Sequence, residues 1–155
     1  MSEWLDTQSK RRVWVLAPKR VEDWPAKKTP WSSERFGLFF AADHVFDAAP
    51  LAKSALNQGL AFVCVWGPGC VIAEDTFDEL IAGDGSHKET EDDVVLTTSH
   101  ADESLEEALE FFLDAMTPSK ALVKGCDARV VFALGDGLGK RVERALEHRK
   151  AVRNK

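Results

Sequence analysis

The chain has 155 residues, of which 45% are hydrophobic and 30% are charged, and its formal net charge is −6. This length and composition are typical of one globular domain over residues 1–155 and exclude a disordered chain. The negative charge disfavours nucleic-acid binding, and no apolar run is long enough to span a membrane. Residues 1–12 do not resemble a signal peptide, and three cysteines make a poor disulfide framework, so we expect a cytoplasmic protein.

Strand and helix patterns alternate along the chain. Short apolar runs predict strands over residues 12–17, 36–42, 60–66, 93–98 and 129–134, and residues 121–123 are a candidate for one extra short strand. Capping residues, glycine stops and apolar spacing of three and four residues predict helices over residues 48–58, 71–82, 104–117 and 138–150. This alternation predicts a three-layer α/β/α sandwich with a mostly parallel sheet of about five strands, as in flavodoxin-like and Rossmann-like folds.

Two segments depart from this regular pattern. Residues 18–35 form a long loop rich in proline and tryptophan, and four of the five tryptophans lie in the first 31 residues. Such a cluster is more often packing for a loop than a binding platform, although both interpretations stay open. The basic tail, residues 148–155, is typical of a solvated helix end and is a candidate for disorder.

The predicted topology places any ligand site at the carboxyl ends of the parallel strands. The segments that emerge there are residues 18–20, 43–44, 67–70, 99–103 and 135–139. We therefore draw the candidate site residues from these segments and their immediate neighbours.

Cys70 is the candidate nucleophile. It follows the turn formed by Gly67, Pro68 and Gly69, and the start of the next helix would favour its thiolate. On this interpretation Gly67 and Gly69 contribute contacts to a ligand. The alternative is that the glycines only make a tight turn and that Cys70 packs as a small apolar residue.

His100 is the candidate acid–base group, with Asp102 or Glu103 to orient it. Thr98 and Ser99 come just before it and are candidate ligand-binding residues. The alternative is that this polar stretch only caps the helix that follows it, which would leave His100 unexplained.

A glycine-rich turn at residues 135–139 offers a third candidate site, in which Gly137 and Lys140 would bind an anion. Its spacing is shorter than that of a phosphate-binding P-loop, and Arg141 stands where that loop has Ser or Thr, so an NTPase is excluded. No spacing of histidines or cysteines fits a metal site, and we expect neither a metal nor a cofactor.

Two stretches of the chain resemble a small bacterial domain family of unknown function. They are the motif WGPxC at residues 66–70, with DTFD at 75–78, and the motif TTxHxxESLxEALxFF at residues 97–112. The resemblance covers residues 60–116, roughly the central half of the chain. It implies a bacterial source and suggests that the two motif loops belong together, but it implies no activity, ligand or catalytic residue.

Three functions fit these observations. The leading hypothesis is a small binding or regulatory domain that acts through a protein partner, such as an immunity-type inhibitor or an accessory subunit, because the middle of the chain is acidic and no catalytic set is convincing. The second is a hydrolase or transferase that uses Cys70 or His100. The third is a sensor of a small anionic, phosphate-bearing ligand at the turn over residues 135–140. The sequence alone leaves all three open.

Overall fold

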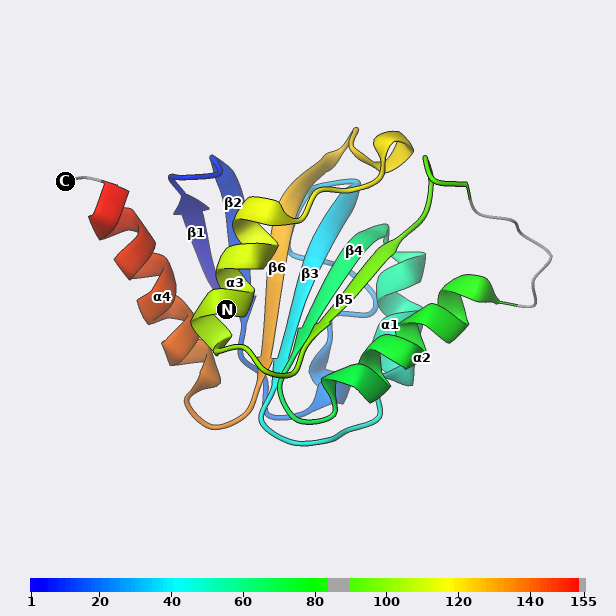
Figure 1. Cartoon of the computed structure of the whole chain (residues 1–155), viewed down its shortest axis with the longest axis horizontal. Helices are drawn as coiled ribbons and strands as arrows, with labels where there is room; N and C mark the ends of the chain where they lie inside the picture. The colour runs from blue at the N-terminus through cyan, green and yellow to red at the C-terminus, as the bar shows by residue number, and fades with distance from the viewer. Residues whose placement is uncertain (84–89, 154–155) are drawn as a thin grey trace.

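A computed structural model describes residues 1–83 and 90–153, in which one sheet has helices on both of its faces (Figure 1). The strands are β1 (Ser2–Asp6), β2 (Arg11–Leu16), β3 (Arg35–Ala42), β4 (Leu60–Trp66), β5 (Leu96–His100) and β6 (Cys126–Leu134). Their order across the sheet is β1-β2-β6-β3-β4-β5. β1 pairs antiparallel with β2, and every other pair of neighbouring strands is parallel.

The helices divide between the two faces of the sheet. α1 (Ala49–Asn57) and α2 (Cys70–Ala82) pack on one face, whereas α3 (Leu105–Glu110) and α4 (Leu138–Arg153) pack on the other. In Figure 1, α3 crosses in front of the strands and α1 lies behind them. A π-helical turn (Phe111–Ala115) extends α3, and two 3-10 turns (Val21–Asp23 and Lys120–Leu122) lie in loops. The predicted three-layer α/β/α sandwich with a mostly parallel sheet is therefore confirmed.

The central strands β3 and β4 explain why the sheet needs cover on both faces. Phe36 and Phe40 of β3 pack on the side of α1 and α2, whereas Phe39 packs on the side of α3 and α4. Burying one such side chain stabilises the fold by about 1.5–3 kcal/mol. Strands that are apolar on both faces belong to parallel sheets, whose crossover helices supply that cover.

The structure differs from the predicted strands in three places. The sheet has six strands, because residues 2–6 add the antiparallel edge strand β1. β5 begins at Leu96 and not at residue 93, because the residues before it bond to another loop. Ser119 Oγ donates to the carbonyl of Val94, and the N–H of Ala121 donates to the carbonyl of Asp92. Residues 121–123 are not a strand, since the 3-10 turn that makes these contacts overlaps them.

The loop over residues 18–35 packs its tryptophans into the core. Trp24 and Trp31 are buried, and their ring centroids lie 5.7 Å apart. The Trp24 ring also contacts Phe132 of β6 at 5.4 Å, and its Nε1 donates to the side chain of Gln58 at the end of α1. These contacts support the packing interpretation for Trp24 and Trp31, because the loop covers the part of the sheet that α1 and α2 leave open.

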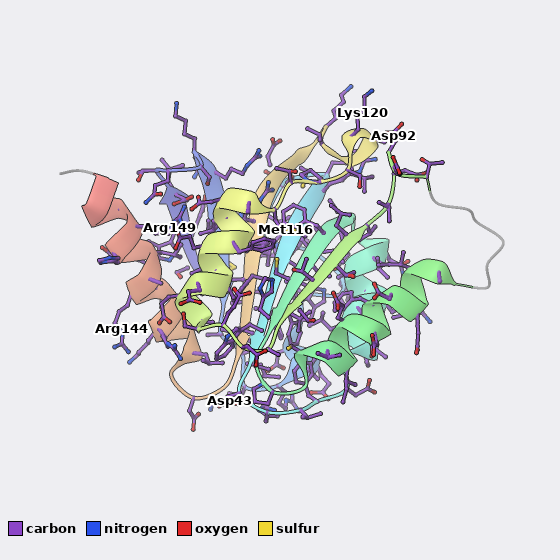
Figure 2. The ribbon with its side chains drawn as sticks, viewed as in Figure 1. Asp43, Asp92, Met116, Lys120, Arg144 and Arg149 are labelled. Atoms are coloured by element: carbon purple, nitrogen blue, oxygen red, sulfur yellow. The ribbon has the colours of Figure 1, made fainter. Side chains whose placement is uncertain are left out.

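The basic tail predicts a solvated helix end, but Arg149 in this tail is buried. α4 continues to Arg153, and the Arg149 guanidinium is buried between Asp6 of β1 and Asp114 of the π-helical turn. Figure 2 shows Arg149 on the side of α4 that faces α3. No helix in the described ranges 1–83 and 90–153 is long and apolar enough to cross a membrane.

Candidate functional site at the carboxyl edge of the sheet

The candidate site is a crevice between neighbouring strands whose connections leave in opposite directions. From β3 the chain continues to α1 on one face, and from β6 it continues to α4 on the other. β3 and β6 are neighbours in the sheet, so their carboxyl ends mark the switch point at which open α/β sheets bind ligands. A crevice of about 810 Å³ lies there, lined by the chain ends of β2, β3 and β6 and the first turns of α4.

Asp43 and His44 form a hydrogen-bonded pair on one wall of this crevice. Figure 2 shows Asp43 at the edge of the sheet opposite Asp92 and Lys120. Nδ1 of His44 lies 2.6 Å from Oδ1 of Asp43. This hydrogen bond lowers the pKa of the Asp43 carboxyl below its usual range. With Nδ1 donating to the carboxylate, the neutral imidazole carries its lone pair on Nε2, which is a proton acceptor.

The opposite wall is the glycine-rich turn between β6 and α4. Gly135 has φ +153°, and an ideal Cβ there would lie 2.4 Å from the carboxyl carbon of Asp43. Glycine at this position therefore lets the ends of β3 and β6 approach closely. α4 begins at Leu138, and the first N–H groups of a helix have no partner within it. The Leu138 N–H donates to the carbonyl of Gly135, and the next two residues of the helix, Gly139 and Lys140, line the crevice.

The charges around the crevice are mixed. Lys19 and Lys140 are exposed on its rim, and Asp136 is exposed beside them. Glu143 accepts a hydrogen bond from Ser2 Oγ at 3.0 Å, and Asp43 is paired with His44. Because these two carboxylates have partners already, the exposed charges available to a bound molecule are those of Lys19, Lys140 and Asp136.

Two of the candidate residues named from the sequence, Gly137 and Lys140, line this crevice. Lys19, Asp43 and His44 also line it and were not among those candidates, although they lie in the predicted strand-end segments. An acid–histidine pair directly after a strand that is apolar on both faces is the signal that would have found Asp43 and His44.

Cys70, Gly67, Gly69 and Glu103 lie around a second, smaller hollow of about 400 Å³. Trp66 Nε1 donates to the carbonyl of Glu103 at 2.8 Å. The WGPxC loop and the loop over residues 101–103 therefore lie together, as the resemblance suggested. The Cys70 side chain packs in the core and is only 3% exposed.

His100 is the buried last residue of β5, beside Trp66 of β4. Its Nε2 lies 2.9 Å from Thr98 Oγ1, its Nδ1 lies 3.0 Å from a carboxylate oxygen of Glu103, and its ring centroid is 5.0 Å from that of Phe111. Ser99 Oγ donates to Glu74, while Asp102 is exposed. Glu103 therefore orients the His100 ring, but both ring nitrogens already have partners, and neither of these partners is Cys70.

The remaining thiols and carboxylates do not assemble a second centre in the described residues. Burial raises the pKa of the Cys64 thiol to about 12, and it also raises that of Cys126. Within residues 1–83 and 90–153, no three His, Cys, Asp or Glu side chains are grouped closely enough to hold a metal ion.

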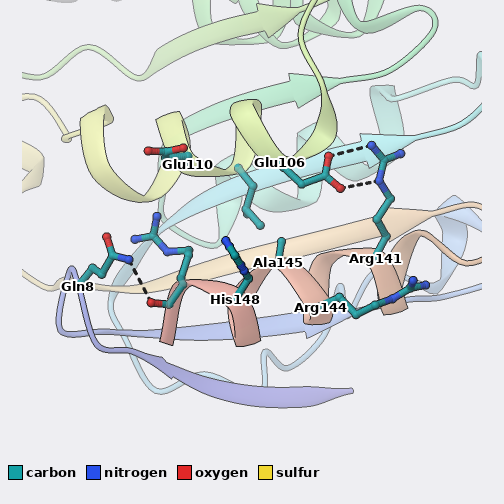
Figure 3. A pocket seen from close by; sticks show the side chains of 9 residues that line it. Gln8, Glu106, Glu110, Arg141, Arg144, Ala145 and His148 are labelled. Carbon is teal, nitrogen blue, oxygen red and sulfur yellow. Dashed lines mark hydrogen bonds and ion pairs between the residues drawn. The ribbon is translucent and has the colours of Figure 1, made fainter. Parts of the chain in front are cut away.

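A cleft of about 530 Å³ lies between α3 and α4, on the outer side of the sheet (Figure 3). Figure 3 shows Glu106 of α3 joined to Arg141 of α4 by two hydrogen bonds, which measure 2.7 and 2.8 Å. Gln8 donates to the carbonyl of Arg149 at the other end of the cleft. The Glu106–Arg141 pair holds α3 against α4 at one end of the cleft, and the charged side chains of Glu110 and Arg144 also line it.

The open, mostly parallel sheet with helices on both faces defines the class of the molecule as an α/β sandwich, and the crevice lies at its switch point. The family described as Domain of unknown function (DUF7684) matches residues 17–146, and the chain belongs to this family. The match begins directly after β2 and includes every residue of the crevice. No curated protein and no solved structure matches the chain.

Proposed function

We propose that the protein binds a small ligand with an anionic group, such as a phosphate, in the crevice between the ends of β2, β3 and β6. The observation that carries this proposal is the convergence of three strand ends and the start of the 16-residue helix α4 on one crevice of about 810 Å³ at the switch point. Open α/β sheets bind their ligands at this position.

The wall formed by α4 suits the anionic group. Backbone N–H groups at the start of a long helix attract negative charge, and glycines leave the backbone accessible to a ligand. Gly137 is exposed, and a Cβ built on it would meet nothing within 4 Å. Lys19 and Lys140 also line the crevice and add positive charge at its rim.

The opposite wall suits a polar part of the ligand. The Asp43 carboxylate fixes the ring of His44 by accepting from Nδ1. Nε2 then accepts a hydrogen bond from a ligand hydroxyl, or donates one when the ring is protonated. The pair of Asp43 and His44 therefore adds specificity for the polar part of the ligand, and no covalent step is needed. The function that we propose is binding.

This proposal develops the sensor hypothesis rather than the enzymatic one. An enzyme that used Cys70 and His100 would need the two side chains within hydrogen-bond reach. The ring nitrogens of His100 bond to Thr98 and Glu103 instead. A role through a protein partner requires a surface rather than a crevice, and is argued separately below.

Thermal unfolding in the presence of inorganic phosphate and of a panel of mononucleotides tests the proposal. The wild type and a Lys53→Ala control on the exposed face of α1 should gain the same increase in Tm with the best probe. The double variant Lys19→Ala, Lys140→Ala should lose most of that gain, because it removes both rim charges. Equal gains in all three proteins, or no gain with any probe, would contradict the proposal.

A further inference from the structure

An exposed apolar patch lies at the start of α2. Val71 is 52% exposed and Ile72 is 61% exposed, although both stand in the first turn of a well-packed helix. The buried seam of α2 is formed by Cys70, Ala73 and Phe77, so Val71 and Ile72 are not needed for its contact with the sheet. Large side chains exposed together in this way mark interaction sites.

The patch continues across two neighbouring loops. Val45, which is 61% exposed, covers Gly69, since an ideal Cβ on Gly69 would lie 2.9 Å from a methyl carbon of Val45. On the other side, the hollow of about 400 Å³ lies beside Val71 and Ile72. Trp66 and Pro68 also line this hollow. The surface thus offers exposed apolar side chains next to a hollow.

The rim of the patch is acidic. Asp75, Asp78 and Glu79 are exposed on α2, and Asp102 is exposed on the loop across the hollow. None of these carboxylates takes part in an ion pair that the structure describes. Lys88, outside the described residues, is the only Lys or Arg between Ser54 and Ser119. Arg141 reaches the hollow, because its guanidinium lies 5.7 Å from the centroid of the Trp66 ring, but it is already paired with Glu106. The carboxylates on α2 therefore keep no basic partner among the ion pairs of the described residues.

We propose that this patch is the docking surface for a partner protein that presents an apolar side chain flanked by lysines or arginines. The apolar side chain enters the hollow beside Trp66, and the flanking cations pair with the α2 carboxylates. Charge complementarity of this kind steers association, while the buried apolar anchor supplies most of the affinity. The proposal does not depend on the ligand crevice.

A second copy of this chain is the main competing occupant. Val123 is 54% exposed between the exposed residues Lys120 and Lys124, and it is the apolar side chain that would enter the hollow of another copy. That contact would be head-to-tail and would not close on itself as a two-fold dimer does. The net charge of −6 on each copy also opposes it and favours a basic partner.

A photo-crosslinking amino acid at position 72, introduced in the cells that make the protein, tests the proposal. The same group at Leu5, which is 59% exposed on β1, is the control. We expect one protein to be captured at position 72 and not at position 5. The captured protein, once purified, should bind the wild type and the Leu5→Ser variant with equal affinity and bind Ile72→Ser at least tenfold more weakly. Its affinity for the wild type should fall as the salt concentration rises.

Three results would overturn the proposal. One is the same set of captured proteins at positions 72 and 5, or no capture at position 72. Another is unchanged affinity of the captured protein for Ile72→Ser. The third is capture of this chain alone, together with concentration-dependent assembly in light scattering that Ile72→Ser abolishes, which would make a second copy the occupant. Circular dichroism of Ile72→Ser should match the wild type, because the side chain is exposed.

Discussion

Oδ1 of Asp43 lies 2.6 Å from Nδ1 of His44, and the same carboxylate occupies the space that a side chain on Gly135 would need. One side chain at the end of β3 therefore fixes the imidazole on its own loop and sets how closely the β6 turn approaches. The geometry of the crevice depends on this contact, because it joins the two strand ends that form its walls.

Gly135→Ala should open the crevice, whereas Gly137→Ala should not. A Cβ at residue 135 would lie 2.4 Å from the Asp43 carboxyl carbon, while at residue 137 it would meet nothing within 4 Å. We expect Gly135→Ala to lower the free energy of unfolding by about 1–3 kcal/mol. Gly137→Ala, with φ +76°, should cost about 1 kcal/mol from backbone strain alone. Urea unfolding gives both values, and equal losses would contradict the packing argument.

His44→Ala should raise the pKa of Asp43. The hydrogen bond from His44 is the largest cause of its lowered pKa. Since the folded-state pKa lies below the unfolded value, ionised Asp43 stabilises the fold above its unfolded pKa, and this contribution is lost as the pH falls through its folded pKa. Carboxyl carbon NMR shifts recorded against pH should therefore titrate at higher pH in the variant. An unchanged titration midpoint would show that the hydrogen bond from His44 does not set the pKa of Asp43.

Asp6→Ala should destabilise the protein by about 3 kcal/mol, because it leaves buried Arg149 with one carboxylate partner in place of two. Glu3→Ala is the matched control, since the Glu3–Arg12 pair is largely exposed, and exposed pairs contribute about 0–1 kcal/mol. Burial opposes ionisation of Asp6, but hydrogen bonds from Arg149 and Ser9 outweigh it and lower its pKa. The difference between wild type and Asp6→Ala in urea should accordingly shrink as the pH falls through the folded-state pKa of Asp6. A pH-independent difference would contradict this.

Arg129→Met should leave the stability unchanged or raise it by about 1–2 kcal/mol. Arg129 is 1% exposed, its Nε has no hydrogen-bond partner, and its Nη1 bonds to the carbonyls of Cys126 and Ala128. Burial of this charge lowers the pKa of the guanidinium. Arg129→Ala removes the side-chain volume as well as the charge, and the cavity that it leaves should lower the free energy of unfolding by about 2–4 kcal/mol. If Arg129→Met is as unstable as Arg129→Ala, the charge itself supports the fold, for instance through its contact with the Phe62 ring at 4.8 Å.

Iodoacetamide should label Cys70 more slowly than free cysteine in the native protein. The side chain is 3% exposed, and alkylation requires an accessible thiolate. Cys64 and Cys126 are also buried, so all three thiols should react at comparable rates only after unfolding in urea. Mass spectrometry of the labelled peptides measures each site. Fast native labelling confined to Cys70 would restore the nucleophile hypothesis.

The regular elements could be predicted from the sequence wherever burial is strong. The runs that became β3 and β4 are apolar on both faces, and Ser104 accepts the N–H of Glu107 as the capping pattern predicts. β1 could not be found this way, because an edge strand such as Ser2–Asp6 buries little and shows no apolar run.

The candidate site was predictable only in part, for a reason of topology. The segments at the strand ends were named correctly, and Gly137 and Lys140 lie in the crevice. The neighbour relation of β3 and β6, however, joins residues that are far apart in the chain. No local pattern encodes that strand order, and so the approach of Asp43 to Gly135 could not be anticipated.

Amide NMR shifts during a titration with inorganic phosphate, and then with the mononucleotide that stabilises the protein most, test the central proposal most directly. We predict saturable shifts at the amides of residues 135–141, at Lys19 and at His44, with no change at Ile72 or Lys53. Shifts at the crevice no larger than those at Lys53, or shifts spread evenly over exposed lysines, would contradict ligand binding at the switch point.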